Sequence, residues 1–259
     1  LHVFVSGQGD PLVLLHGWGM NSSLLGELAE SLSDRYRVYR VDLPGHGLSR
    51  PVPLFDLEHV LPLMESVLPP HAHWVGWSLG GLISAAMAER APNRVRSLTF
   101  LASSPCFVSE GEWPGISADL LDQMGRDFVT DYGATLSRFV GLQTFGQVGG
   151  RQLARHVLSR LEEAPTPNSS NLIDALGLLK MLDFRAMMSR LPQPVLMILG
   201  AKDRLVPVAL GGAMAGVMPS LRIKVIGDAA HIPFATHPAE VTEEIRDFLG
   251  SLKAEDVIG

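Results

Sequence analysis

Short apolar runs alternate with helical stretches along most of this 259-residue chain. We expect strands over residues 12–15, 37–41, 73–77, 97–102, 195–199 and 221–226, and helices over residues 79–89 and 238–252. This alternation is typical of a parallel sheet, because a right-handed connection between two parallel strands needs an intervening helix. The sequence therefore predicts an α/β fold, with a mostly parallel sheet flanked by helices.

The alternation stops between about residues 105 and 190, where the pattern indicates helices only. We expect these helices over residues 119–131, 134–142, 150–163 and 170–182. Because the segment interrupts a strand-rich chain, we interpret it as an insertion rather than an independent domain. We therefore expect residues 1–105 and 191–259 to form an α/β core and residues 106–190 to form a helical cap over the edge of the sheet.

The composition describes a globular protein with an acidic net charge. Apolar residues make up 46% of the chain and charged residues 19%, which excludes intrinsic disorder. The net charge of −6 argues against a general nucleic-acid or membrane-surface binder. The single cysteine, Cys106, excludes an intramolecular disulfide and a cysteine-based metal site. No apolar run is long enough to span a membrane, so we expect a cytoplasmic protein.

A serine between two glycines lies where the strand expected at 73–77 meets the helix expected at 79–89. The run reads Gly76-Trp77-Ser78-Leu79-Gly80 and has the G-x-S-x-G spacing of a nucleophile elbow. The tight turn needs small residues two positions before and two positions after the serine. The start of the helix behind it offers N–H groups to a developing oxyanion. The sequence therefore predicts that Ser78 is a nucleophile.

A nucleophilic serine needs a histidine base and an acid that orients the base. In the fold that carries this elbow, the acid and then the base follow the serine along the chain. Asp203 follows the strand expected at 195–199 and His231 follows the strand expected at 221–226, so both satisfy this order. Asp42 is the serious rival for the acid, but the Leu-Pro-Gly-His-Gly run behind it favours a structural loop.

The run His16-Gly17-Trp18-Gly19 follows the first expected strand. Its glycines permit a sharp turn that presents a main-chain N–H group inward. We expect the backbone N–H groups of Trp18 and Leu79 to form an oxyanion hole, and His16 to be structural rather than catalytic.

The elbow, the Asp203 loop, the His231 loop and the His-Gly loop together resemble the α/β-hydrolase superfamily over essentially the whole chain. The segments at residues 16–19, 76–81, 102–107, 112–116 and 139–144 are similar to the carboxylesterases of biotin biosynthesis. This resemblance implies a serine carboxylesterase that hydrolyses the methyl ester of pimeloyl-acyl carrier protein through an acyl-enzyme, without a metal or an organic cofactor. It also implies a substrate site formed by Trp18, Ser78, Leu79, Phe139, Val140, Gly141, Leu142, Gln143 and His231.

The expected cap carries an unbalanced positive charge. Residues 132–161 contain no Asp or Glu, yet they contain Arg138, Arg151, Arg155 and Arg160. Arg151 and Arg155 are four positions apart and share one helix face. One interpretation is a solvated face whose arginines pair with acids elsewhere. The other is that Arg138, Arg151 and Arg155 dock the acidic acyl carrier protein by electrostatic steering.

Two other functions stay open at this point. The elbow is also compatible with a hydrolase of this fold that acts on free small esters, thioesters or carbon–carbon bonds. A receptor that keeps the triad but turns over negligibly would carry the same residues. We expect a monomer that binds neither nucleic acid nor membrane.

Overall fold

A seven-stranded sheet forms the centre of the protein, and the computed structural model describes residues 1–256. The strand order is β1-β3-β2-β4-β5-β6-β7. The strands are β1 (His2–Ser6), β2 (Asp10–Leu15), β3 (Tyr36–Asp42), β4 (Ala72–Trp77), β5 (Val95–Leu101), β6 (Val195–Gly200) and β7 (Arg222–Ile226). Strand β1 pairs antiparallel with β3, and the other described pairs are parallel. The predicted mostly parallel sheet is confirmed.

Strand β1 was not expected from the sequence. It lies at one edge of the sheet, and its last three residues are exposed, including Phe4 and Val5. An edge strand with no buried face leaves no buried apolar run for the sequence pattern to reveal. The six expected strands, by contrast, are all present at their expected positions.

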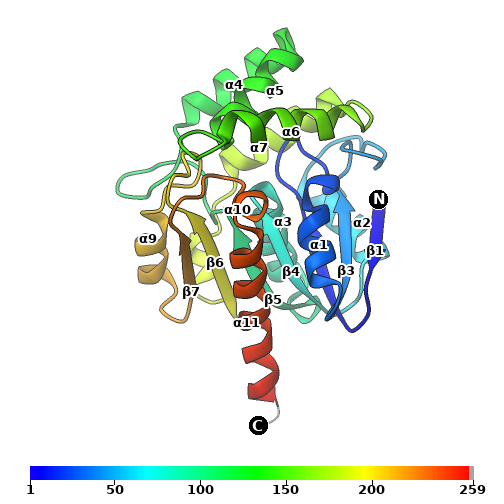
Figure 1. Cartoon of the computed structure of the whole chain (residues 1–259), viewed down its shortest axis with the longest axis vertical. Coiled ribbons are helices and arrows are strands. Elements are labelled where there is room, and N and C mark those ends of the chain that lie inside the picture. The colour runs from blue at the N-terminus through cyan, green and yellow to red at the C-terminus, as the bar shows by residue number, and fades with distance from the viewer. Residues whose placement is uncertain (257–259) are drawn as a thin grey trace.

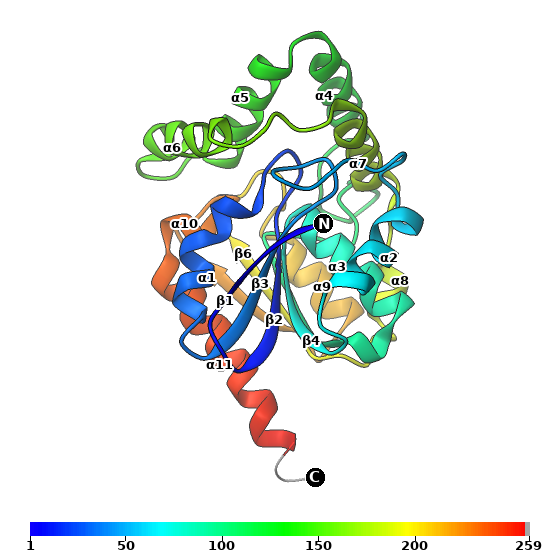
Figure 2. The ribbon, with the colours of Figure 1, turned by 90° about the vertical axis from the view of Figure 1, so that its right-hand side faces the viewer.

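Helices cover both faces of the sheet. Figure 2 shows α1 (Gly26–Leu32) and α11 (Pro238–Asp256) on one side of the sheet, and α2 (Leu57–Val67) and α3 (Leu79–Arg90) on the other. The remaining short elements are η1 (Ser22–Leu25), η2 (Pro92–Arg94), α8 (Arg185–Met188), α9 (Leu210–Val217) and α10 (Pro233–Thr236).

Helix α3 is packed directly against the central strands. Every residue from Leu79 to Ala88 is buried. Its first turn can approach the sheet because it contains Gly80 and Gly81, and a Cβ atom on Gly80 would lie 2.5 Å from the carbonyl oxygen of Leu15. This close packing fixes the start of α3, and therefore Ser78, against the carboxyl ends of β2 and β4.

Four helices lie together beyond one end of the sheet (Figure 1): α4 (Ala118–Thr130), α5 (Tyr132–Gln143), α6 (Gly150–Glu162) and α7 (Ser169–Met181). We call them the cap helices. They match the four helices expected from the sequence to within two residues at each end. Ser117, Asp131 and Asn168 each accept a hydrogen bond from a backbone N–H of the following first turn, which explains where three of the helices begin.

The expectation that residues 105–190 contain helices only is wrong at the start of that segment. There the chain forms three short β-bridges, Cys106 with Asp183, Val108 with Ile116 and Glu110 with Trp113. The first bridge joins the start of the inserted segment to Asp183, seven residues before its expected end at residue 190. Such pairing is set by residues distant in sequence, so a local pattern does not reveal it.

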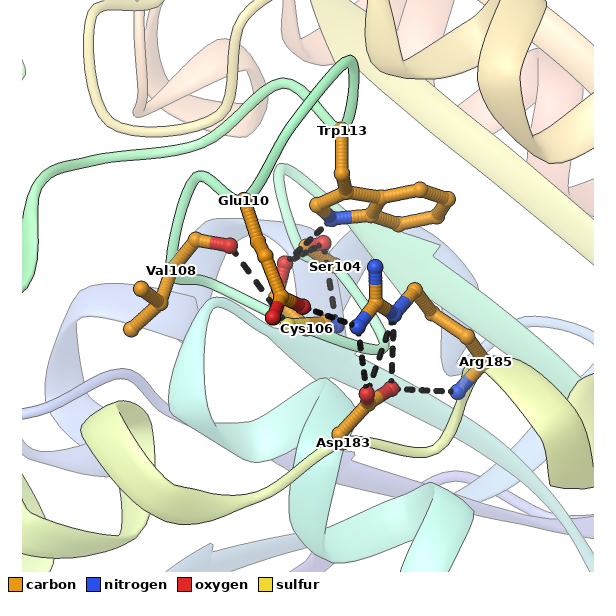
Figure 3. A network of polar contacts seen from close by, with 7 residues as sticks. All are labelled: Ser104, Cys106, Val108, Glu110, Trp113, Asp183 and Arg185. Atoms are coloured by element: carbon orange, nitrogen blue, oxygen red, sulfur yellow. Dashed lines mark hydrogen bonds and ion pairs between the residues drawn. The ribbon is translucent and has the colours of Figure 1, made fainter.

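Polar contacts reinforce this junction (Figure 3). Arg185 lies between Asp183 and Glu110, at N–O distances of 2.6 Å and 2.8 Å, and its guanidinium faces the ring of Trp113. The Trp113 indole N–H donates to the Cys106 carbonyl at 2.9 Å. Burial, and then the nearby Asp183 carboxylate, raise the pKa of the Cys106 thiol, as expected for a packed rather than a nucleophilic cysteine. No helix within residues 1–256 is both long and apolar enough to cross a membrane.

Candidate active site

Ser78 occupies a strained turn between β4 and α3. Its φ of 53° and ψ of −121° lie outside the regions that most side chains adopt. The turn is held by hydrogen bonds from the Ser78 N–H to Leu101 O (3.1 Å) and from Ser103 Oγ to Ser78 O (2.6 Å). A Cβ atom on Gly76 would lie 2.3 Å from the backbone of Gly80, so this geometry requires glycine there. The expected strand–turn–helix context of the elbow is present.

The predicted acid and base, Asp203 and His231, are in contact. His231 Nδ1 lies 2.7 Å from Asp203 Oδ2, and both side chains are almost wholly inaccessible to solvent. The other carboxylate oxygen, Oδ1, accepts hydrogen bonds from the N–H groups of Leu205 (2.8 Å) and Val206 (3.0 Å). An ionised carboxylate can only accept hydrogen bonds, so the imidazole donates here and its Nδ1 carries the proton. His231 Nε2 is buried and has no partner within the described part of the chain.

Asp42, the rival candidate for the acid, uses both carboxylate oxygens to hold a loop together. Its two carboxylate oxygens accept from the N–H groups of Ser22 (2.8 Å) and Leu48 (2.9 Å). Burial raises the pKa of Asp42, but the opposing effects of the nearby His16 and of these N–H donors hold it below its ordinary value. A Cβ atom on Gly47 would lie 2.4 Å from the carboxylate, so the Gly-His-Gly run closes around it. This is a structural loop.

His16 fixes the loop that contains Gly17 and Trp18. Its Nε2 accepts from Leu43 N–H at 3.0 Å, and its Nδ1 donates to Gly17 O at 2.8 Å. A ring that accepts at one nitrogen is neutral, and burial lowers the pKa of His16 accordingly. The loop lies beside the elbow, because a Cβ atom on Gly17 would be 3.1 Å from Ser78 Cβ.

Two main-chain donors stand near Ser78 without an acceptor. Within residues 1–256, neither the Trp18 N–H nor the Leu79 N–H donates a hydrogen bond. The Trp18 side chain is separately anchored, since its indole N–H donates to Leu172 O at 2.7 Å. An oxyanion hole needs such unpaired donors, and this role for the two N–H groups stays a prediction.

A narrow apolar cavity lies over Ser78. It measures about 10 Å³ and is lined by Ser78, Phe107, Ile116, Leu121, Met124, Phe139, Leu176, Leu179 and Leu205. Three of the four cap helices, α4, α5 and α7, contribute to this lining, so the cap helices stand over the carboxyl ends of the strands. A larger cavity of about 640 Å³ between α1, α6 and α10 does not include Ser78. We take the smaller cavity as the candidate active site, because it contains Ser78 of the elbow, whereas the larger cavity does not.

The segment expected to bind substrate has two sides. Phe139 lines the Ser78 cavity and packs edge-on against Trp18, with ring centroids 5.1 Å apart. Gln143, one helical turn further on, uses its carbonyl to accept the His231 N–H at 3.0 Å. Val140 is buried and Leu142 partly buried, whereas Gly141 is exposed on the outer side of α5. A substrate role for the segment stays a prediction.

Most of the cavity lining was missed by sequence reasoning. Leu121 and Met124 belong to α4, and Leu176 and Leu179 to α7. Both helices were expected from the sequence, but a local pattern does not show what the apolar residues of a helix cover.

The cap arginines fall into two groups. Arg138 pairs with Asp127 at 3.1 Å, and Arg160 pairs with Glu163 at 3.0 Å. Arg151 and Arg155 are exposed on α6, have no carboxylate partner within residues 1–256, and line an open groove of about 580 Å³ on the outer face of the cap helices. The solvated, paired interpretation therefore describes Arg138 and Arg160, and the unpaired charge is confined to the other two.

The alpha/beta hydrolase fold model matches residues 10–238, and this match includes the elbow, Asp203 and His231. The chain belongs to the α/β-hydrolase family. Its sequence is 41% identical over 251 residues to a pimeloyl-[acyl-carrier protein] methyl ester esterase of Methylococcus capsulatus, covering 97% of this chain and 99% of that protein. It is 39% identical over 247 residues to the protein of the same name from Photobacterium profundum, covering 94% of this chain and 96% of that protein.

Solved structures agree on the fold of this hydrolase. An esterase from Exiguobacterium antarcticum superposes with a TM-score of 0.86 at 22% identity, covering 96% of this chain and 95% of the other. A hydrolase from Pseudomonas aeruginosa superposes with a TM-score of 0.81 at 24% identity, covering 96% of this chain and 93% of the other. At these identities the likeness supports the α/β-hydrolase architecture and nothing finer.

Proposed function

We propose that this hydrolase is a serine carboxylesterase in which Ser78 is the nucleophile, His231 the general base and Asp203 the residue that orients the base. The observation that carries the proposal is the buried Asp203–His231 contact of 2.7 Å, which leaves Nε2 of the imidazole unpartnered within the described part of the chain. The imidazole lies next to the elbow, since its ring centroid is 6.0 Å from that of Trp77. The neutral imidazole, protonated at Nδ1, can take a proton only at Nε2.

In the first half of the reaction, Ser78 Oγ attacks the ester carbonyl while His231 Nε2 takes the hydroxyl proton. The imidazolium that forms is stabilised by the Asp203 carboxylate. The carbonyl oxygen becomes an oxyanion and accepts hydrogen bonds from the Trp18 and Leu79 N–H groups. Collapse of this intermediate breaks the bond to the alkoxy oxygen, which leaves as the alcohol with the proton from His231. Water then repeats the sequence on the acyl-enzyme.

We propose that the substrate is the methyl ester of pimeloyl-acyl carrier protein. The relatives at 41% and 39% identity carry that activity in their names and match nearly their whole length. The apolar lining of the Ser78 cavity suits a chain of methylene groups, because transfer of such a chain out of water is favourable. The triad and oxyanion hole complete this chemistry without a cofactor.

The unpaired arginines support docking of the acidic carrier at the outer groove. Arg151 and Arg155 are exposed and free of carboxylates, so they can attract an acidic surface by long-range steering. Arg138 is a weaker candidate, because Asp127 already neutralises it. We infer a cytoplasmic monomer in which residues 106–190 act as the cap of a core formed by residues 1–105 and 191–259.

Carrier docking is tested by the double variant Arg151→Glu, Arg155→Glu. Its kcat/KM for the carrier-bound ester should fall about tenfold or more at low salt and less at high salt, because rim charges act on association. Its rate on a small uncharged ester should not change. The matched control is Arg126→Glu, Arg190→Glu, which reverses two exposed arginines outside residues 132–161. Equal losses on both substrates would contradict docking.

The same assays separate the two alternative functions. A wild-type protein that hydrolyses small esters but not the carrier-bound ester would be a hydrolase of free esters or thioesters. A receptor would give at most one equivalent of alcohol for each equivalent of protein, without steady turnover.

A further inference from the structure

We propose that Gln147 is a positioning residue. It links the loop between α5 and α6 to the loop that contains His231, and it thereby holds the His231 imidazole in its catalytic position when the cap is closed. This inference rests on the proposed role of His231 as general base. The loop comprises residues 144–149 and is called the cap loop below.

Hydrogen bonds from three directions hold the backbone around His231. The Trp77 indole N–H donates to His231 O at 2.8 Å, from the strand that leads to Ser78. The His231 N–H donates to Gln143 O at 3.0 Å, at the end of α5. The preceding N–H, that of Ala230, donates to Gln147 Oε1 at 3.1 Å. Two of the three contacts therefore come from the cap side of the molecule.

Gln147 is directed inward from an otherwise exposed stretch of the cap loop. Its neighbours Gly146 and Val148 are exposed, and Val148 is 93% exposed, whereas Gln147 is only 9% exposed. Gly146 and Gly149 have φ values of 82° and 72°, so the chain bends on either side of Gln147 in a conformation that glycine favours. The amide oxygen of Gln147 is used and its Nε2 has no partner within the described part of the chain. The amide oxygen of Gln147 therefore makes the contact with the His231 loop, and the amide NH₂ group does not.

The cap loop also contacts the loop of the acid. The Arg204 guanidinium lies 3.9 Å from the centroid of the Phe145 ring, a cation–π distance. Arg204 directly follows Asp203 in the chain. The cap loop thus touches the residue after the proposed acid and the residue before the proposed base.

These contacts link substrate admission to the geometry of the base. The cavity over Ser78 holds about 10 Å³, the volume of about one water molecule, so an acyl chain enters only when the cap side moves away. Movement of the cap loop breaks the Gln147–Ala230 hydrogen bond and frees the backbone beside His231. Closure over the substrate restores it. Catalysis is sensitive to such placement, since a shift of about 1 Å costs on the order of 100-fold in rate.

The test compares two near-isosteric variants on a small chromogenic ester. Gln147→Met removes the acceptor and should lower kcat about tenfold with a smaller change in KM, because the base and not the binding cavity is displaced. Gln147→Glu keeps an acceptor and should retain kcat near that of wild type. Its added negative charge beside the His231 loop should move the acidic limb of the pH–rate profile to higher pH. The matched control is Gln152→Met, an exposed glutamine on α6 without a side-chain hydrogen bond in residues 1–256.

A Gln147→Met enzyme with the kcat of Gln152→Met would overturn the inference. If Gln147→Met does not fold, the Glu variant decides: retained kcat with a shifted acidic limb supports positioning, and an unshifted limb refutes it. Failure of the proposed function gives a different result, because the wild-type protein would then not hydrolyse the ester, or Ser78→Ala would hydrolyse it equally well.

Discussion

Acid should destabilise this fold through a buried histidine that the reaction does not use. His46 is wholly buried, and its Nδ1 donates to Pro44 O at 2.9 Å. Its ring lies 5.2 Å from that of His16, and its Nε2 has no partner within residues 1–256. Burial first, and then the neighbouring His16, lower the pKa of His46 from 6.5 to about 3.

The sign and size of the effect follow from proton binding. Between pH 6.5 and about 3, the unfolded chain binds a proton at His46 that the folded protein does not bind. The free energy of unfolding therefore falls as the pH falls through this window. At pH 5, about 1.5 pH units below the unfolded pKa, the loss amounts to about 2 kcal/mol, since one unit corresponds to about 1.4 kcal/mol.

Urea unfolding at pH 7 and pH 5, followed by tryptophan fluorescence, measures this loss. His46→Asn removes the titrating ring and keeps a donor towards Pro44 O. Between the two pH values, the wild type should lose about 2 kcal/mol more than this variant. His156→Asn, at an exposed position on α6, should behave as the wild type does. Parallel losses for wild type and His46→Asn would refute the reasoning.

Two further pairs of substitutions test the assignment of the acid and the junction of the cap segment. Asp203→Asn should lower kcat by on the order of 10⁴, by analogy with other serine hydrolases; Asp42→Asn should lower stability and leave kcat on a small ester nearly unchanged, and initial rates of the two folded variants check this. Arg185→Met, which removes partly exposed ion pairs and a ring contact, should lower the free energy of unfolding by about 1 kcal/mol after solvent screening. Arg160→Met, with one exposed pair, should cost less than about 0.5 kcal/mol by urea unfolding.

The residues that carry the proposed chemistry could be predicted from the sequence because the elbow constrains them strongly. The Gly76–Ser78–Gly80 spacing is a steric requirement of one turn, visible in five residues. The order of Ser78, Asp203 and His231 then follows from strands whose buried apolar runs stand out in the chain. The same strength of pattern gave the six parallel strands and the four cap helices.

Features built from distant pairs could not be predicted in this way. Strand β1 has no buried face, and the Cys106–Asp183 bridge joins positions far apart in sequence. The Arg138–Asp127 pair crosses from α5 to α4 and neutralises an arginine that has no acidic neighbour within residues 132–161. The contact between Gln147 and Ala230 spans 83 positions. Each depends on how finished elements pack, which local periodicity does not encode.

The most direct test of the account is the intact mass of the acyl carrier protein after incubation with this enzyme. The carrier should bear the pimeloyl methyl ester, and wild type and Ser78→Ala should be compared at equal concentration. The wild type should convert the carrier to a species lighter by one methylene group, the free acid that remains when methanol leaves. Ser78→Ala, folded by circular dichroism, should leave the mass unchanged, because loss of the nucleophile costs on the order of 10⁶ in kcat in serine hydrolases. An unchanged carrier with wild type, or equal conversion by Ser78→Ala, would contradict the account.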